Sequence, residues 1–181
     1  MARHEESTDD ARFLKTVSTT LRIISLLEEH NGATANELTE ELDISKSSVY
    51  SHLMTLADHD FVSKQGETYE LSFRFLTLGE FVRNQSVLYR YGHKQVEQLS
   101  EDTGEYAHLT VEQNGWGVNV YKTRGRNAVG EEFQTKRLQK PDFLHYSATG
   151  KSILAHLPEE RVEAIIEEYG LPERTEQTIT D

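Results

Sequence analysis

Residues 34–57 read TANELTEELDISKSSVYSHLMTLA and outline two short helices joined by a tight turn. Thr34 followed three residues later by Glu37 is a capping-box pattern, which predicts a helix that starts here and runs to about Leu42. After a two-residue link, Ser45 can accept a hydrogen bond from the first turn of the next helix. That next helix has an apolar inner face at helical spacing, formed by Val49, Leu53 and Leu56.

The flanking segments extend this pattern on both sides. On the N-terminal side, apolar residues at helical spacing predict a helix over about 16–29, which Asn31-Gly32 ends. On the C-terminal side, residues 61–64 and 68–71 are typical of short strands around a turn that contains glycine. Three helices followed by a hairpin is the order of the winged helix-turn-helix, so the sequence predicts such a domain over residues 13–73.

The outward residues of the third predicted helix are mostly small and polar, and no acidic residue occurs between Ile44 and Ala57. Small hydroxyls let a helix approach the floor of the major groove and can bind phosphates or base edges. Together with a cap residue and a hairpin lysine, they form the candidate DNA contacts: Thr34, Ser45, Lys46, Ser47, Ser48, Tyr50, Ser51 and Lys64. The alternative is purely structural, because any three-helix bundle needs an apolar stripe and serine is an ordinary helix cap.

The chain is strongly acidic, with 31 Asp and Glu against 19 Lys and Arg and a formal net charge of −12. Nucleic-acid binders usually carry a basic surface, so the total taken alone argues against DNA. The acidic excess is present in both halves but avoids the third helix, which weakens that argument. An evenly acidic surface fits a halophilic protein, and an acidic mesophilic protein fits the composition equally well.

The chain contains no cysteine, which excludes disulfides, thiolate nucleophiles and cysteine zinc sites. Its polar, acidic start is not typical of a signal peptide, and residues 1–12 are expected to be flexible. No apolar run approaches the roughly 20 residues that a membrane helix needs. We therefore expect a cytoplasmic protein with no membrane partner.

The second half changes its hydrophobic period twice. An apolar helical stripe predicts a linker helix over 74–86, and a further helix covers about 88–101. Alternating apolar residues on both sides of Asn114-Gly115 then predict a β-hairpin, because Asn-Gly favours a two-residue turn. The remaining predicted elements are a polar loop over 125–130 and helices over about 149–157 and 159–169.

Gly150-Lys151-Ser152 matches the end of a Walker A phosphate-binding loop, but His145 stands where that motif needs its first glycine. The eight histidines are scattered, so the sequence predicts no metal site. No nucleophile, base and orienting group can be recognised together. The sequence therefore indicates neither an enzyme nor a cofactor.

The first half resembles the DNA-binding half of the IclR family of transcription regulators. The resemblance rests on residues 42–50, LDISKSSVY, and on the hairpin residues 61–71 with their tyrosine-bearing second strand. Leu78-Gly79 also stands where the family's linker helix ends. Two positions depart from the family pattern: Asp60 replaces the usual glycine before the wing, and Ser51 stands where a basic residue is common.

The second half resembles the effector domain of the same family. Residues 144–158, LHYSATGKSILAHLP, are similar to its signature, and residues 175–181, TEQTITD, are similar to the stretch that follows. The resemblance implies a GAF-like domain that binds small organic acids or aromatic compounds through a pocket loop at Ala148, Thr149 and Gly150. The alternative is that Gly150 only permits close packing and Ser147 only caps a helix.

The sequence thus predicts an α+β fold, with a winged helix-turn-helix, a linker helix and part of a GAF-like α/β effector domain over 87–181. The domain is expected to be partial because the family's effector domain continues beyond this chain. The apolar stripes of the first helix and of the helix around 76–82 predict a homodimer or a dimer of dimers on double-stranded operator DNA. The competing interpretations are a small-molecule-binding module or enzyme without DNA, and a dimerisation adaptor. Trp116 and Tyr121 fit either the core or a pocket wall.

Overall fold

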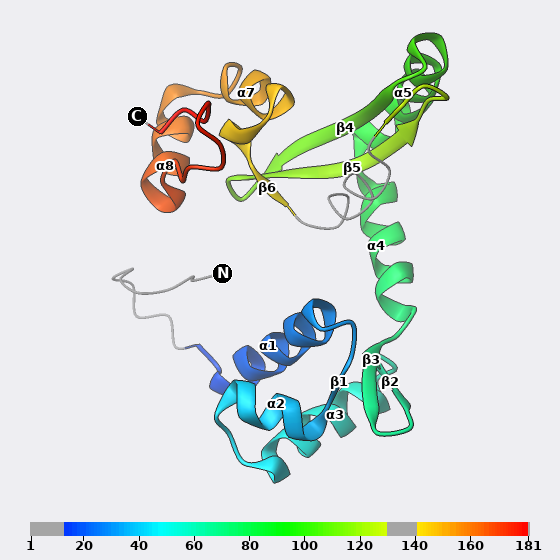
Figure 1. Cartoon of the computed structure of the whole chain (residues 1–181), viewed down its shortest axis with the longest axis vertical. Helices are drawn as coiled ribbons and strands as arrows, with labels where there is room; N and C mark the ends of the chain where they lie inside the picture. The colour runs from blue at the N-terminus through cyan, green and yellow to red at the C-terminus, as the bar shows by residue number, and fades with distance from the viewer. Residues whose placement is uncertain (1–12, 130–140, 181) are drawn as a thin grey trace. The chain divides into compact units, whose positions relative to one another are not determined.

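The computed structural model describes residues 13–129 and 141–180 (Figure 1). The segment expected to be flexible, residues 1–12, lies outside the described residues. The chain divides into two compact units, Met1–Glu80 and Phe81–Asp181. Each unit combines helices with an antiparallel sheet, which is the α+β class that the sequence predicts.

Helices α1, α2 and α3 and a small antiparallel sheet build the first unit. Its elements are α1 (Lys15–Glu29), β1 (Ala33–Thr34), α2 (Ala35–Leu42), α3 (Lys46–Asp58), β2 (Val62–Gln65) and β3 (Thr68–Leu71). The strand order is β1-β3-β2, and Lys64 lies opposite Tyr69 in the hairpin. The sequence did not predict β1, because a strand of two residues shows no period. It forms through its pairing with β3, where Ala33 lies opposite Tyr69.

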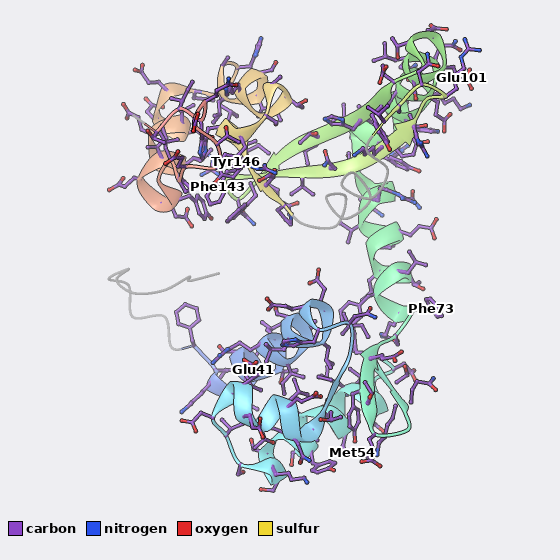
Figure 2. The ribbon with its side chains drawn as sticks, viewed as in Figure 1. Glu41, Met54, Phe73, Glu101, Phe143 and Tyr146 are labelled. Atoms are coloured by element: carbon purple, nitrogen blue, oxygen red, sulfur yellow. The ribbon has the colours of Figure 1, made fainter. Side chains whose placement is uncertain are left out.

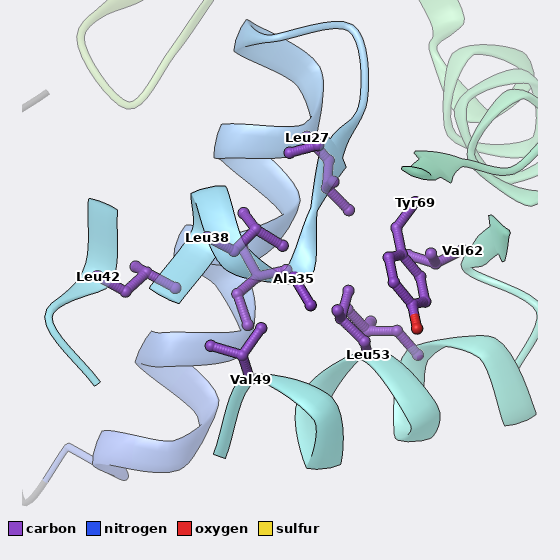
Figure 3. Packing of buried hydrophobic residues seen from close by; sticks show 11 residues of the cluster. Leu27, Ala35, Leu38, Leu42, Val49, Leu53, Val62 and Tyr69 are labelled. Atoms are coloured by element: carbon purple, nitrogen blue, oxygen red, sulfur yellow. The ribbon is translucent and has the colours of Figure 1, made fainter. Parts of the chain in front are cut away.

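The core of the first unit joins these three helices to the sheet (Figure 3). Ile23 of α1, Leu38 of α2, and Val49 and Leu53 of α3 are fully buried, and Tyr69 of β3 belongs to the same cluster. Burying an aliphatic side chain of this size contributes about 1.5–3 kcal/mol. The inner faces predicted from helical spacing therefore hold the unit together and fix which face of α3 points outward.

Side-chain caps set where α2 and α3 begin. The Thr34 hydroxyl accepts the Glu37 N–H at 3.3 Å, and the Thr34 N–H donates to the Glu37 carboxylate at 2.7 Å, which confirms the predicted capping box. The Thr34 N–H and hydroxyl lower the pKa of Glu37. Asp43 takes a left-handed φ of 50° between the helices, and Ser45 accepts the Ser48 N–H at 3.2 Å.

Asp60 stands at the entrance to the hairpin, where the family pattern has glycine. Its φ is 61°, in the left-handed region that glycine adopts at little cost and that aspartate tolerates better than most residues. The Ser72 hydroxyl donates to the Asp60 carbonyl and so ties the end of the hairpin to its start. Aspartate in place of glycine at position 60 therefore changes the side chain, and the backbone still takes the left-handed conformation that glycine favours.

The second unit contains a longer antiparallel hairpin covered by a helix. The chain passes into it through α4 (Arg74–Gln85), and the order continues as α5 (Val87–Thr103), β4 (Tyr106–Gln113), β5 (Trp116–Arg124), β6 (Asp142–Phe143), the 3₁₀ turn η1 (Leu144–Tyr146), α7 (Ala148–Leu154) and α8 (Glu159–Tyr169). The strand order is β4-β5-β6, and α5 packs along β4 and β5 (Figure 1). A Cβ on Gly92 would lie 3.2 Å from Leu109, so glycine lets the helix approach the sheet closely.

The differences from the predicted elements are small and local. The sequence missed β6 and η1, and it extended α7 to about residue 157 where the helix ends at Leu154. Residues 155–157 continue as a turn, since the His156 N–H donates to Ile153 and the Leu157 N–H to Leu154. Within the described ranges, no helix is long and apolar enough to cross a membrane.

Candidate DNA interface and effector face

The exposed face of α3 lies opposite its buried aliphatic residues. Ser47, Tyr50 and Ser51 recur at helical spacing. Met54, labelled in Figure 2, follows on the same stripe with 62% of its surface exposed. The three polar residues were predicted from the sequence. Met54 was missed because candidate contacts were sought among polar residues, although its position seven residues after Ser47 would have identified it.

The hydroxyl groups on this face are held by the helix itself. Ser51 donates to the Ser47 carbonyl at 3.0 Å, and Thr55 donates to the Ser51 carbonyl at 2.8 Å. The hydroxyl oxygens of Ser45 and Ser47 lie 3.0 Å apart. Ser51 and Thr55 therefore present oxygen lone pairs to the outside, since their protons point back to the helix.

Two lysines contact neighbouring aromatic rings beside these hydroxyls. The Lys46 Nζ lies 5.9 Å from the ring centroid of Tyr50, and the Lys64 Nζ in β2 lies 5.3 Å from that of Tyr69. At exposed sites such cation–π contacts contribute only about 0.5–1 kcal/mol. Both ammonium groups can therefore turn toward a phosphate and lose only this small cation–π energy.

The position of α3 is fixed by a polar contact as well as by the core. The His52 Nδ1 and the Thr20 hydroxyl lie 2.8 Å apart and join α3 to α1. Thr34, the remaining candidate from the sequence, is half-buried, and its hydroxyl donates to Glu37 in the capping box at 2.8 Å. The acids Glu37, Glu40 and Glu41 line a hollow that is formed by the turn after α1, by β1 and by α2, and that includes no residue of α3.

In the second unit, one face of the β4–β5 hairpin is polar. His108 lies opposite Lys122, and Thr110 donates to Asn119 at 2.7 Å across the strands. A register shift between Leu109 and Thr110 leaves these pairs on the same face. Partial burial and the charge of Lys122 lower the pKa of His108, so its ring is neutral near pH 7.

The first turn of α7 meets this polar face, so the predicted pocket loop at Ala148, Thr149 and Gly150 is the start of a helix. The Thr149 hydroxyl lies 3.2 Å from the His108 Nε2, which brings a residue predicted from the sequence next to one that the sequence analysis missed. Ser147 caps α7 by accepting the Gly150 N–H at 3.0 Å. A Cβ on Gly150 would lie 2.0 Å from the Leu144 carbonyl oxygen, so only glycine fits there. Ala148 is exposed at the helix start.

Trp116 and Tyr121, which the sequence assigned to either the core or a pocket wall, lie outside this polar face. Tyr121 turns to the α5 side, where its hydroxyl donates to Glu97 at 2.6 Å and this contact raises the pKa of Tyr121 to about 12. The Trp116 ring packs 4.8 Å from Phe143 and 5.0 Å from Tyr169, measured between centroids. Both residues therefore serve packing in the second unit.

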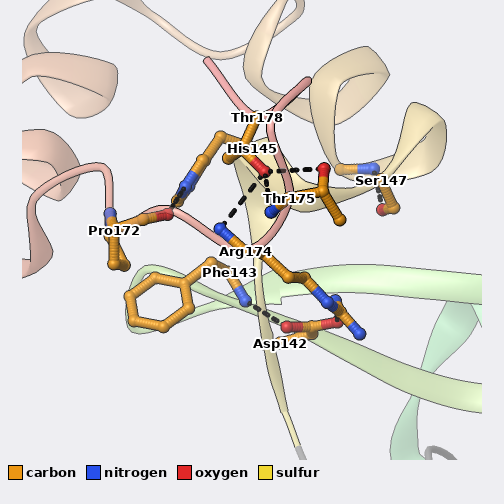
Figure 4. A network of polar contacts seen from close by, with 9 residues as sticks. Asp142, Phe143, His145, Ser147, Pro172, Arg174, Thr175 and Thr178 are labelled. Atoms are coloured by element: carbon orange, nitrogen blue, oxygen red, sulfur yellow. Dashed lines mark hydrogen bonds and ion pairs between the residues drawn. The ribbon is translucent and has the colours of Figure 1, made fainter. Parts of the chain in front are cut away.

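The polar segment after α8 folds back onto β6 and η1 (Figure 4). The Arg174 guanidinium binds Asp142 at 2.8 Å and lies 5.0 Å from the ring centroid of Tyr146. His145 Nε2 lies 3.1 Å from the Pro172 carbonyl oxygen, and the Thr178 hydroxyl accepts N–H groups of the same segment. The TEQTITD stretch thus starts as a compact turn, and the residues just before it, Pro172 and Arg174, make the contacts with η1 and β6.

Both parts of the chain match known protein-family models. Residues 16–66 match the IclR helix-turn-helix domain, and residues 82–181 match the bacterial transcriptional regulator IclR C-terminal domain. The chain belongs to the IclR family of transcriptional regulators. The family resemblance identified from the sequence is therefore confirmed. Proteins of the IclR family are transcriptional regulators, which are not enzymes.

Individual IclR-family proteins are similar over most of the chain. A probable HTH-type transcriptional regulator ArcR from Halobacterium salinarum is 36% identical over 160 residues, which cover 88% of this chain and 61% of that relative. The structure of Thermotoga maritima IclR has a TM-score of 0.67 at 24% identity and is matched over 92% of this chain and 67% of its own. An IclR homolog from Microbacterium hydrocarbonoxydans, complexed with 4-hydroxybenzoate, has a TM-score of 0.73 at 17% identity, with coverage of 92% and 69%.

The two solved structures share the fold of this chain. The chain itself spans about three fifths of the length of the curated relatives it matches.

Proposed function

We propose that this IclR-family chain is a transcription regulator that contacts operator DNA through α3. The observation that carries the proposal is the exposed face of α3, which has no acidic residue over residues 44–57 in a chain of net charge −12. In this arrangement α3 enters the major groove, with Lys46 and the serines near phosphates and base edges, and Lys64 in the hairpin contacts the backbone. Such a regulator works in the cytoplasm with the chromosome.

Binding to the DNA upstream of its own gene, measured at several salt concentrations, tests this function. The logarithm of the affinity falls linearly with the logarithm of the salt concentration, and the slope reports how many phosphates are neutralised. A salt-dependent preference for this duplex over a shuffled duplex supports the proposal. Ligand binding with no salt-dependent DNA affinity would instead favour a small-molecule-binding module.

We further propose that the operator is bound by a homodimer or a dimer of dimers. α1 exposes Val17 and Leu21, and α4 exposes Leu76, Phe81 and Val82. All of α4 lies within the described part of the chain, and none of its residues is buried. Exposed apolar helix faces of this extent are usually covered by a partner, and a two-fold pair would present two copies of α3 to a palindromic site.

Sedimentation of the full chain at micromolar concentration tests the assembly. We expect a dimer or tetramer for the native chain and a shift toward monomer for Phe81→Glu, because the new charge would be buried in the contact. A native chain that sediments as a monomer at these concentrations would contradict this assembly.

We propose that the second unit binds a small organic acid or aromatic compound between the polar face of β4–β5 and the first turn of α7 at Ala148, Thr149 and Gly150. Lys122 supplies a positive charge, and His108 and Thr149 supply hydrogen-bonding groups beside it. The Microbacterium homolog, which binds the aromatic acid 4-hydroxybenzoate, supports this chemistry. Ligand binding would then change operator affinity, and DNA would change ligand affinity by the same factor.

Calorimetric titration with aromatic and aliphatic carboxylates tests the effector face. An anion beside His108 raises the pKa of that ring, so binding takes up protons and the measured heat depends on the buffer's ionisation enthalpy. Lys122→Gln should weaken binding at unchanged stability. If no carboxylate binds saturably, the loop has only its structural roles, with Ser147 as a cap and Gly150 as a close contact.

A further inference from the structure

Between Lys46 at its start and Asp58 at its end, the exposed face of α3 lacks the side chains that usually identify base pairs through paired hydrogen bonds. In the major groove, arginine or lysine pairs with guanine, and asparagine or glutamine pairs with adenine. From Lys46 to Asp58, α3 contains no arginine, asparagine or glutamine. Its lysine and its aspartate stand at the two ends, so the middle of the face carries neither type of charge.

The hydroxyls in the middle of this face cannot donate hydrogen bonds to bases in place of arginine, asparagine or glutamine. Ser51 and Thr55 already donate to carbonyls of the preceding turn, at 3.0 and 2.8 Å. What they offer to a base is an acceptor oxygen, which adenine and cytosine amino groups can both satisfy. Hydrogen bonds to Ser51 and Thr55 therefore distinguish only weakly between base pairs.

Met54 is the large apolar side chain at the centre of the face. It follows Ser47 by seven residues and Ser51 by three, and 62% of it is exposed on the outer side of α3 (Figure 2). Tyr50, 38% exposed, lies one turn before it. In the major groove, thymine alone presents a methyl group, and a flexible thioether side chain adapts well to an apolar contact.

We propose that Met54 determines operator specificity by packing against the 5-methyl group of a thymine in each half-site. The proposal rests on the DNA-binding function proposed above. It makes α3 a reader of thymine through apolar contact, with Lys46 and the serines holding the helix in register on the backbone. Tyr50 borders the same contact and limits the space around the methyl group.

Replacing thymine by deoxyuridine tests this contact, because the exchange removes only the 5-methyl group. Duplexes that bind the full chain are first selected from a random-sequence library, and each thymine of a selected duplex is then replaced in turn. We expect a loss of about fourfold in affinity at one thymine per half-site, the size expected for burying one methyl group. Met54→Ala should bind the thymine and deoxyuridine duplexes equally.

Two variants serve as controls. Met54→Leu retains an apolar side chain and should retain the preference for thymine. Lys64→Ala should weaken binding to every duplex alike and lower the salt slope by about one, with the thymine-to-deoxyuridine ratio unchanged. Because Met54 is exposed, its substitutions should leave the thermal midpoint of unfolding unchanged, which circular dichroism can verify.

The outcomes separate this inference from the proposed function. Salt-dependent binding with equal affinity for thymine and deoxyuridine duplexes overturns the inference and leaves DNA binding intact. A preference for thymine that persists in Met54→Ala assigns the methyl contact to another residue and also overturns it. Failure to enrich any duplex from the library overturns the proposed function itself.

Discussion

Ser47 shows that a small side chain can be required by both a helix and its proposed partner. It lies in the first turn of α3, where its hydroxyl is 3.0 Å from that of the capping residue Ser45. Its backbone carbonyl accepts the Ser51 hydroxyl one turn later. A larger or charged residue at this position would leave the helix intact and change only the surface offered to DNA.

Ser47→Glu is therefore expected to abolish operator binding without loss of stability. A carboxylate in the first turn of a helix is favourable by about 0.3–1 kcal/mol, so the thermal midpoint should not fall. On the DNA side, the same carboxylate would face phosphates on a stretch of α3 that has no other acid before Asp58. Gel-shift titration and circular dichroism measure the two effects.

Ser152→Glu is a matched control for Ser47→Glu. It introduces the same charge at an exposed serine of α7 in the second unit, so it reproduces the change in total charge. Its DNA affinity should stay close to that of the native chain. Native affinity in Ser47→Glu would contradict the placement of α3 in the groove.

Gly150→Ala is expected to destabilise the second unit by about 1–3 kcal/mol, as overpacking of a close backbone contact does. The added methyl would lie 2.0 Å from the Leu144 carbonyl oxygen, and neither backbone segment can yield easily. Gly79→Ala in α4 is the matched control. It meets no atom within 4 Å and should stabilise the helix by about 0.5–1 kcal/mol. Equal unfolding midpoints of the two variants would refute this account of Gly150.

At the scale of elements, periodic segments with clear end signals were predictable from the sequence. α8 has the predicted bounds, Glu159–Tyr169, and the β4–β5 turn lies at Asn114-Gly115. α2 begins where its capping box indicates. In contrast, β1 and β6 have two residues each and exist only through pairing with β3 and β5, so no local pattern could reveal them.

The candidate DNA interface on α3 was more predictable than the effector face, because helical spacing is a local pattern and strand pairing is not. The polar residues of α3 follow from helical spacing alone, and Met54 could have been included by the same rule. The approach of His108 to Lys122 and Thr149 depends on strand register and on the bulge after Leu109. Register is a property of two paired strands, so the sequence of one strand does not determine it.

The capping box of α2 provides a test at the element scale. Thr34→Ala should lower the free energy of unfolding by about 1 kcal/mol, because the first turn loses an acceptor. Thr34→Ser, which keeps the hydroxyl, should behave like the native chain. Urea denaturation of the three proteins at pH 7 measures the difference.

The same cap predicts a pH dependence. The pKa of Glu37 is lowered by its hydrogen bonds to Thr34, so the folded state binds fewer protons at this group than the unfolded state. The stabilisation is therefore fully present above the ordinary glutamate pKa of about 4.3 and is lost as the pH falls through the lowered value. Thr34→Ala should lose less stability than the native chain over that acidic range. The backbone N–H of residue 34 still donates to Glu37 in the variant, so parallel acid profiles would show that the Thr34 hydroxyl does not lower the pKa of Glu37.

At the scale of the whole molecule, the net charge of −12 sets two opposing responses to salt. Repulsion among surface acids destabilises the folded state, and salt weakens it by shortening the Debye length from about 10 Å at 0.1 M to about 3 Å at 1 M. Salt would also weaken the proposed contacts of Lys46 and Lys64 with phosphates. Because only these two cations are involved, the affinity would fall only slowly as the salt concentration rises. An acidic regulator can therefore gain stability in salt while it loses little DNA affinity.

This balance predicts that the thermal midpoint of unfolding rises with KCl, with most of the rise below about 1 M, where screening is nearly complete. A variant with Glu40, Glu41 and Glu167 changed to glutamine should show a smaller rise, because these exposed carboxylates contribute to the repulsion. Scanning calorimetry of both proteins over the same KCl series measures the effect. A midpoint that is flat or falls with KCl would mean that the acids are spaced widely enough for repulsion to be negligible. The charge would then give no reason to expect that the protein works in a salt-rich cell.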